Sequence, residues 1–133
     1  MNHKVLVAML MSVVLWGAVS GCACMDRRPQ RPAMIGHIVF IGLSDLADYD
    51  EILGDSESML STIPGVVSFA AGRHIDTGRS SVLHDYDLAI YIGFDSVEGL
   101  AAYVNHDQHI AYVTKWKPRL SALRVYDMHD PTP

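Results

Sequence analysis

The chain has 133 residues, of which 50% are hydrophobic and 19% are charged, and its formal net charge is −5. This length suits one globular domain rather than two, and the composition excludes a disordered chain. From residue 33 onward, six basic residues stand against fourteen acidic ones, a net charge of −8. A nucleic-acid-binding protein needs a basic surface, so we expect no nucleic-acid partner.

Residues 1–21 are typical of a secretory signal peptide. Lys4 precedes an apolar run from residue 5 to residue 16, and small residues follow it. The run is shorter than the roughly 20 residues that cross a bilayer as a helix. Its end, Val19-Ser20-Gly21-Cys22, resembles the bacterial lipobox. That resemblance implies cleavage before Cys22 and acylation of this cysteine.

We therefore expect an exported lipoprotein that faces the periplasm and is held in the membrane through Cys22. Ala23, and not aspartate, follows the cysteine, which favours the outer membrane in a cell with two membranes. An ordinary signal peptide with an incidental cysteine, or an uncleaved anchor, are the alternatives. Residues 22–33 contain three arginines and two prolines without apolar periodicity, so we expect a flexible tether there.

Residues 34–129 are expected to form one α+β domain, followed by a short tail at 130–133. Its strands are indicated by β-branched and aromatic content, and its helices by apolar residues at three- and four-residue spacing. In chain order we expect a strand at 35–43, a helix at 45–63, strands at 66–75 and 86–94, helical stretches from Ser96 and over 107–117, and a strand at 122–128. A polar connection at 76–85 joins the second and third strands.

The order β-α-β-β-α-β predicts a ferredoxin-like, four-stranded antiparallel sheet with its helices on one face. The first strand is apolar on both faces, with His37 and Val39 on one and Ile38 and Phe40 on the other. Because the helices cover only one face, the other is free for association or for a ligand. We expect a homodimer whose two sheets face each other as a dimeric α+β barrel, with His37 facing the barrel interior.

A family resemblance rests on four parts of the domain. They are Met34-Ile35-Gly36-His37-Ile38-Val39, Ile63-Pro64-Gly65-Val66, Tyr86-Asp87-Leu88-Ala89 with Phe94-Asp95-Ser96, and Ala102-Tyr103-Val104-Asn105-His106-Asp107-Gln108-His109. Together they resemble the stress-responsive A/B barrel family, also called Dabb, of the dimeric α+β barrel superfamily. Asp107 departs from the family pattern, which usually has proline between the two histidines. The export sequence is also not a general feature of that family.

The resemblance implies a pocket lined by His37, Tyr103 and His109, the positions that match those of family members reported as polyketide cyclases. A neutral imidazole removes a proton beside a carbonyl, and a tyrosine hydroxyl stabilises the enolate that forms. We take these three as candidate catalytic residues. The expected ligand site comprises His37, Tyr49, Tyr91, Tyr103, His106 and His109.

The function that we predict is binding of a small, partly apolar molecule in the barrel. The alternatives are an acid–base enzyme that uses His37, Tyr103 and His109, and a structural or partner-docking module of the cell envelope. In the last case the acidic residues of the first helix would form the docking face: Asp45, Asp48, Asp50, Glu51, Asp55 and Glu57. His106 and His109 with Asp107 offer donors for zinc or copper, but their spacing matches no known zinc motif. We predict neither a metal nor a cofactor.

Overall fold

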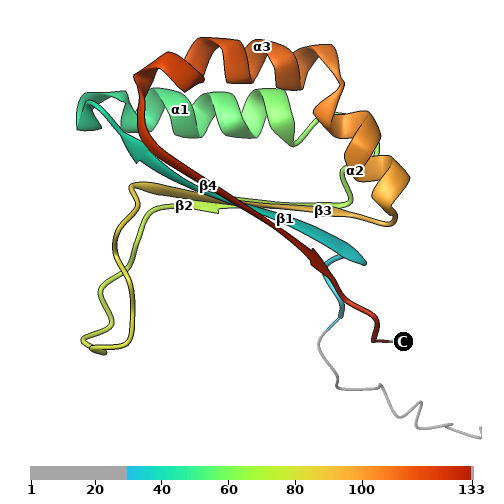
Figure 1. The fold of residues 1–133 in the computed structure, drawn as a ribbon, viewed down its shortest axis with the longest axis horizontal. Coiled ribbons are helices and arrows are strands. Elements are labelled where there is room, and N and C mark those ends of the chain that lie inside the picture. The colour runs from blue at the N-terminus through green and yellow to red at the C-terminus, as the bar shows by residue number, and fades with distance from the viewer. Residues whose placement is uncertain (1–29, 133) are drawn as a thin grey trace, which may run out of the picture.

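The computed structural model describes residues 30–132, so the expected signal peptide, Cys22 and most of the expected tether lie outside the described residues. Four strands of the described part form one antiparallel sheet in the order β2-β3-β1-β4. They are β1 (Ile35–Leu43), β2 (Ser68–Gly72), β3 (Leu88–Phe94) and β4 (Leu120–His129). The helices lie on one face of this sheet (Figure 1), which confirms the ferredoxin-like arrangement.

The helical layer consists of two segments. The first comprises the 3-10 turn η1 (Leu46–Asp48), α1 (Tyr49–Asp55) and the π-helical turn η2 (Ser56–Leu60). The second comprises α2 (Val97–Val104), α3 (Asp107–Trp116) and the 3-10 turn η3 (Lys117–Arg119). Among the residues that the structure describes, no helix is long and apolar enough to cross a membrane.

Several boundaries differ from those expected. Pro118 does not end the helical region, because it occupies the first turn of η3, where its missing N–H has no intrahelical acceptor to lose. β2 is shorter than predicted, since its pairing with β3 ends where Gly72 meets Ala89. The chain then leaves the sheet, and β3 begins only at Leu88. β4 extends in both directions because its pairing with β1 continues from Leu120 to His129.

Side chains cap the helices at their first residues. The Ser96 hydroxyl accepts a hydrogen bond from the Gly99 amide at 3.1 Å, as a Ser cap of α2 predicts. His106 caps α3, because its Nδ1 accepts from the Gln108 amide at 3.2 Å. This cap, together with the chain reversal at Asn105, sets the start of α3 and therefore the place of His109.

The strand pairings assign each residue of β1 to one of the two sheet faces. His37 lies opposite Ile92 of β3 and Asp127 of β4, and this face packs against the helices. Our assignment of His37 to the interior of a barrel between two sheets was therefore wrong. Both faces of β1 are apolar, so its alternation did not show which of them meets the helices.

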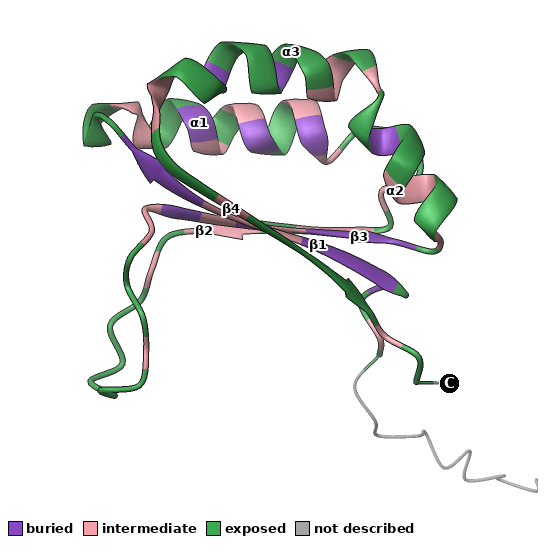
Figure 2. Ribbon diagram, in the orientation of Figure 1, coloured by how far each residue is buried: buried purple, intermediate pink, exposed green. Residues whose placement is uncertain are grey.

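The opposite face of the sheet carries no helix and is called the uncovered face below. It presents Ile38 and Phe40 of β1, Ala89 and Tyr91 of β3, and Tyr126 and Met128 of β4. β4 is an edge strand, and most of its residues are exposed (Figure 2). The uncovered face thus leaves large apolar side chains without cover in the single subunit.

The two ends of the domain lie together. The Arg31 guanidinium forms an ion pair with Asp130 at 3.2 Å, and the Asp130 amide donates to the Met34 carbonyl at 2.8 Å. The chain therefore enters and leaves the sheet at the same end, beside the start of β1 and the end of β4.

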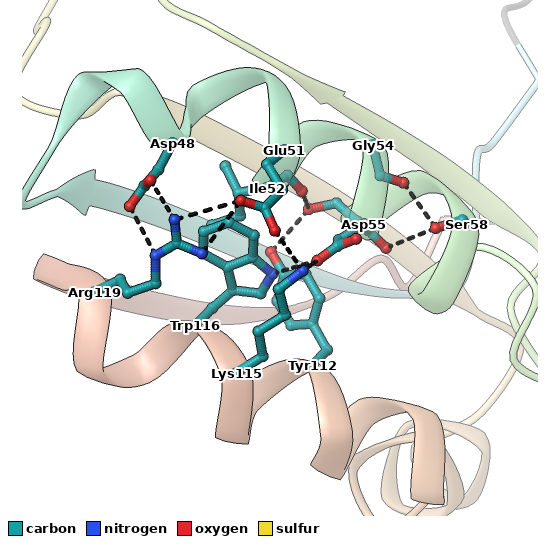
Figure 3. A network of polar contacts seen from close by, with 11 residues as sticks. Asp48, Glu51, Ile52, Gly54, Asp55, Ser58, Tyr112, Lys115, Trp116 and Arg119 are labelled. Atoms are coloured by element: carbon teal, nitrogen blue, oxygen red, sulfur yellow. Dashed lines mark hydrogen bonds and ion pairs between the residues drawn. The ribbon is translucent and has the colours of Figure 1, made fainter.

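A polar network joins α1 to α3 and η3 (Figure 3). Asp55 accepts hydrogen bonds from Lys115 Nζ at 2.6 Å and from the indole nitrogen of Trp116 at 2.9 Å. Arg119 binds Asp48 and lies 3.3 Å from the Glu51 carboxylate. Three of the six acidic residues expected to face a partner, Asp48, Glu51 and Asp55, are thus engaged by α3 and η3 of the same subunit.

Replacing Asp55 by alanine is expected to lower the free energy of unfolding by about 1–3 kcal/mol, because the fully buried Trp116 loses the acceptor for its N–H. Glu57→Ala, at an exposed position in the adjoining η2 turn, is the matched control, with an expected change below about 0.5 kcal/mol. Urea unfolding followed by circular dichroism measures both values. Equal effects of the two substitutions would contradict this role of Asp55.

Candidate functional site

A cavity of about 220 Å³ lies between the sheet and α3. Its wall is mostly apolar and comes from β1, β3, β4, α2 and α3. Polar side chains enter it at few places, notably His37, Tyr103, His109, Tyr112 and Lys117. Its opening lies toward the edge strand β4, where the lining residues Leu123 and Val125 are about half exposed. A cavity of about 150 Å³ can hold benzene, so this one has room for a small organic molecule.

Three elements bring His37, Tyr103 and His109 together. His37 is the third residue of β1, Tyr103 lies in the last turn of α2, and His109 lies in the first turn of α3. The Tyr103 ring is 6.0 Å from the His37 ring and 4.7 Å from the His109 ring, measured between centroids. His37 is 8% exposed and Tyr103 is 1% exposed, so this end of the cavity is shielded from solvent.

Hydrogen bonds fix the orientation of both imidazoles. His37 Nδ1 lies 2.6 Å from an Asp127 carboxylate oxygen, and His109 Nδ1 lies 2.9 Å from the Val104 carbonyl oxygen. A carboxylate and a carbonyl only accept hydrogen bonds, so each Nδ1 carries the proton. In the neutral form of each ring, Nε2 is then the unprotonated nitrogen and accepts a proton from a ligand.

Asp127 is the site residue that the sequence analysis missed. It lies opposite His37 in the pairing of β4 with β1, and it orients the imidazole. The available indication was the alternation of Leu123, Val125 and Asp127 on one face of the last strand, which places a carboxylate among apolar side chains. Nothing in the sequence marks it as a motif.

Burial sets the protonation of this end of the cavity. Partial burial lowers the pKa of His109 below its ordinary value of 6.5, and the nearby His37 adds to this, against the opposing bond to Val104. His109 is therefore mainly neutral at pH 7. Burial also raises the pKa of Tyr103 far above its ordinary range, so its hydroxyl keeps its proton. The site thus combines proton acceptors with a hydroxyl donor.

The other predicted ligand-binding residues do not line the cavity. Tyr49 packs under the Arg73 guanidinium at 3.9 Å, away from α3. Tyr91 lies on the uncovered face, where it packs over Gly36. His106 caps α3. Within residues 30–132, no three side chains of the types that bind metals lie close enough together to share an ion.

Comparison with known proteins finds the same fold in solved structures, whereas no curated protein matches the chain. A Dabb family protein with a ferredoxin-like fold from Mesorhizobium loti is 24% identical over 74% of this chain and 97% of its own, with a TM-score of 0.63. A dimeric ferredoxin-like protein of unknown function from Thermobifida fusca is 20% identical over 77% and 97%, with a TM-score of 0.62. The hydroxynitrile lyase from Passiflora edulis is 16% identical over 77% and 99%, with a TM-score of 0.65.

The match to a family of sequences covers nearly all of the folded part. It runs from residue 35 to residue 130, which includes β1 through β4 and every residue that lines the cavity. The chain therefore belongs to the family of the Stress responsive A/B Barrel Domain, or Dabb.

Proposed function

We propose that this protein binds a small, mainly apolar molecule in the cavity between α3 and the sheet. The proposal rests on one observation, the convergence of His37, Tyr103 and His109 from three elements on one end of an otherwise apolar cavity. Ligand sites of proteins commonly combine an apolar wall with a few polar groups that orient the ligand. The ligand site is thus placed within each subunit and not between two sheets.

The proposal includes a homodimer anchored through lipid. The uncovered face supports the dimer because its apolar side chains, such as Ile38 and Phe40, need cover, and the similar Thermobifida fusca protein is dimeric. The lipobox-like sequence at Cys22 supports an exported protein held by acyl chains, with the domain on the periplasmic side. The outer membrane is the expected location in a cell with two membranes.

Acid–base catalysis is the second candidate, and the His37–Asp127 pair favours it. A carboxylate on Nδ1 orients an imidazole and stabilises its protonated form, as a general base requires. On a hydroxynitrile, His37 Nε2 would take the hydroxyl proton and the bond to the nitrile carbon would break as the carbonyl forms. The cyanide that leaves would then take this proton from His37, which gives hydrogen cyanide and restores the base. The hydroxynitrile lyase with this fold supports the choice of that test substrate.

Benzamide is a neutral probe of the proposed cavity, and we expect it to shift the NMR resonances of Trp116 and His109, which both line the wall. Val125→Phe should abolish these shifts because the larger side chain fills the opening. Val97→Phe, at another exposed valine that lies outside the cavity wall, should leave them unchanged. Binding that survives Val125→Phe would place the ligand elsewhere.

If the site is catalytic, the protein should accelerate the release of benzaldehyde from mandelonitrile, and His37→Ala should lower the rate by about 10²–10⁴-fold. His84→Ala, in the exposed connection between β2 and β3, should have no effect. The rate should fall as the pH drops through the pKa of His109, below 6.5, because protonation removes a proton acceptor. Asp127→Ala should also move the His37 proton from Nδ1 toward Nε2, which ¹⁵N shifts report. No acceleration over buffer would rule out this reaction and leave the binding proposal standing.

The dimer proposal predicts that Tyr126→Glu, on the uncovered face, converts the protein to a monomer, because it places a charge in the interface. Leu46→Glu, at an exposed position in η1, should leave the dimer intact. Sedimentation velocity measures the mass of each variant. A wild-type monomer, or a dimer that persists with Tyr126→Glu, would contradict this interface.

A further inference from the structure

Lys117 lines the cavity at the end opposite the histidines. Along the helical segment, Lys117 follows His109 by eight residues, a rise of about 12 Å. Along the sheet, the cavity extends from His37 to Ile41, which is about 13 Å of β1. The two estimates agree, so the cavity is elongated, with the imidazoles and Tyr103 at one end and the exposed residue Lys117 at the other.

The charge of Lys117 has no counterpart in the described residues. Its neighbours Lys115 and Arg119 both bind carboxylates of α1 and η1, as the network of Figure 3 shows. The other paired arginines, Arg31, Arg73 and Arg124, bind Asp130, Asp50 and Asp85. No carboxylate of residues 30–132 forms an ion pair with Lys117. Arg79 also has no ion pair among residues 30–132, but of these two exposed cations only Lys117 lines the cavity, where it would face the negative charge of a ligand.

We propose that the ligand of this cavity is a small organic carboxylate with an apolar or aromatic body. This inference rests on the proposed binding function and adds the chemical class of the ligand. The carboxylate lies at Lys117, the body lies against the apolar wall, and the far end of the ligand reaches the imidazoles. A single ammonium group suits a singly charged carboxylate, whereas phosphate sites in proteins commonly use arginine forks or several backbone amides.

Benzoate and benzamide test the inference, because they have nearly the same shape and differ in charge. Isothermal titration calorimetry of the full-length protein in mild non-ionic detergent gives both affinities. We expect benzoate to bind about tenfold more tightly than benzamide, as one charge-assisted contact provides. Lys117→Gln should lower the affinity for benzoate about tenfold and so remove this preference, and Lys117→Arg should retain it.

Lys115→Gln is the matched control, since it removes a positive charge two residues away on the side of α3 that faces α1. It should keep the preference for benzoate. Equal binding of the two probes to the wild type would overturn the carboxylate assignment and leave the proposed binding function intact. The assignment is also overturned if Lys117→Gln weakens both probes alike, or if Lys115→Gln abolishes the preference. Binding of neither probe would refute both the assignment and the proposed function.

Discussion

The bond from the Trp116 indole to Asp55 holds α3 against α1, and the cavity depends on it. Trp116 is fully buried, and its N–H has to find an acceptor where water is absent. Asp55 provides that acceptor from the end of α1, while Lys115 and Arg119 attach the same stretch of chain to neighbouring carboxylates. The helix that carries His109 at its start and precedes Lys117 is thereby fixed at its C-terminal end over the sheet. The cavity lies between α3 and the sheet, and these bonds to α1 and η1 set the position of α3 above it.

His106 and His109 lie on either side of the start of α3 and have different roles. His106 completes the start of α3 by accepting from a backbone amide, and His109, one turn later, turns toward Tyr103. The spacing of three residues therefore joins a structural histidine to one that lines the cavity. A substitution at either position would disturb the site, through the helix start in the first case and through the chemistry in the second.

The sequence predicted the elements well and their partners less well. Strand composition, helical spacing and the Ser96 cap are local properties, so the order of elements and the ferredoxin-like sheet followed from them. The orientation of β1 did not follow, because Val39 and Ile38 are equally apolar and either face could meet the helices. Asp127 was missed for a related reason, since its importance comes from lying opposite His37 across a strand pairing. The acidic residues of η1 and α1 looked free because their partners, Lys115 and Arg119, lie 60 to 71 residues away in the chain.

The contact of Arg31 with Asp130 shows that the entry and exit of the folded domain lie side by side at one end of the sheet. A short link between these ends would need to bridge little space, whereas the connection between β2 and β3 is long and exposed. The chain could consequently be connected in a different order without changing where the strands and helices lie. A circular permutant that joins the present ends and opens within residues 76–85 should keep the same sheet, the same helical layer and the same cavity. In such a permutant any anchor would hold the domain by the opposite end, with the imidazoles turned away from the point of attachment.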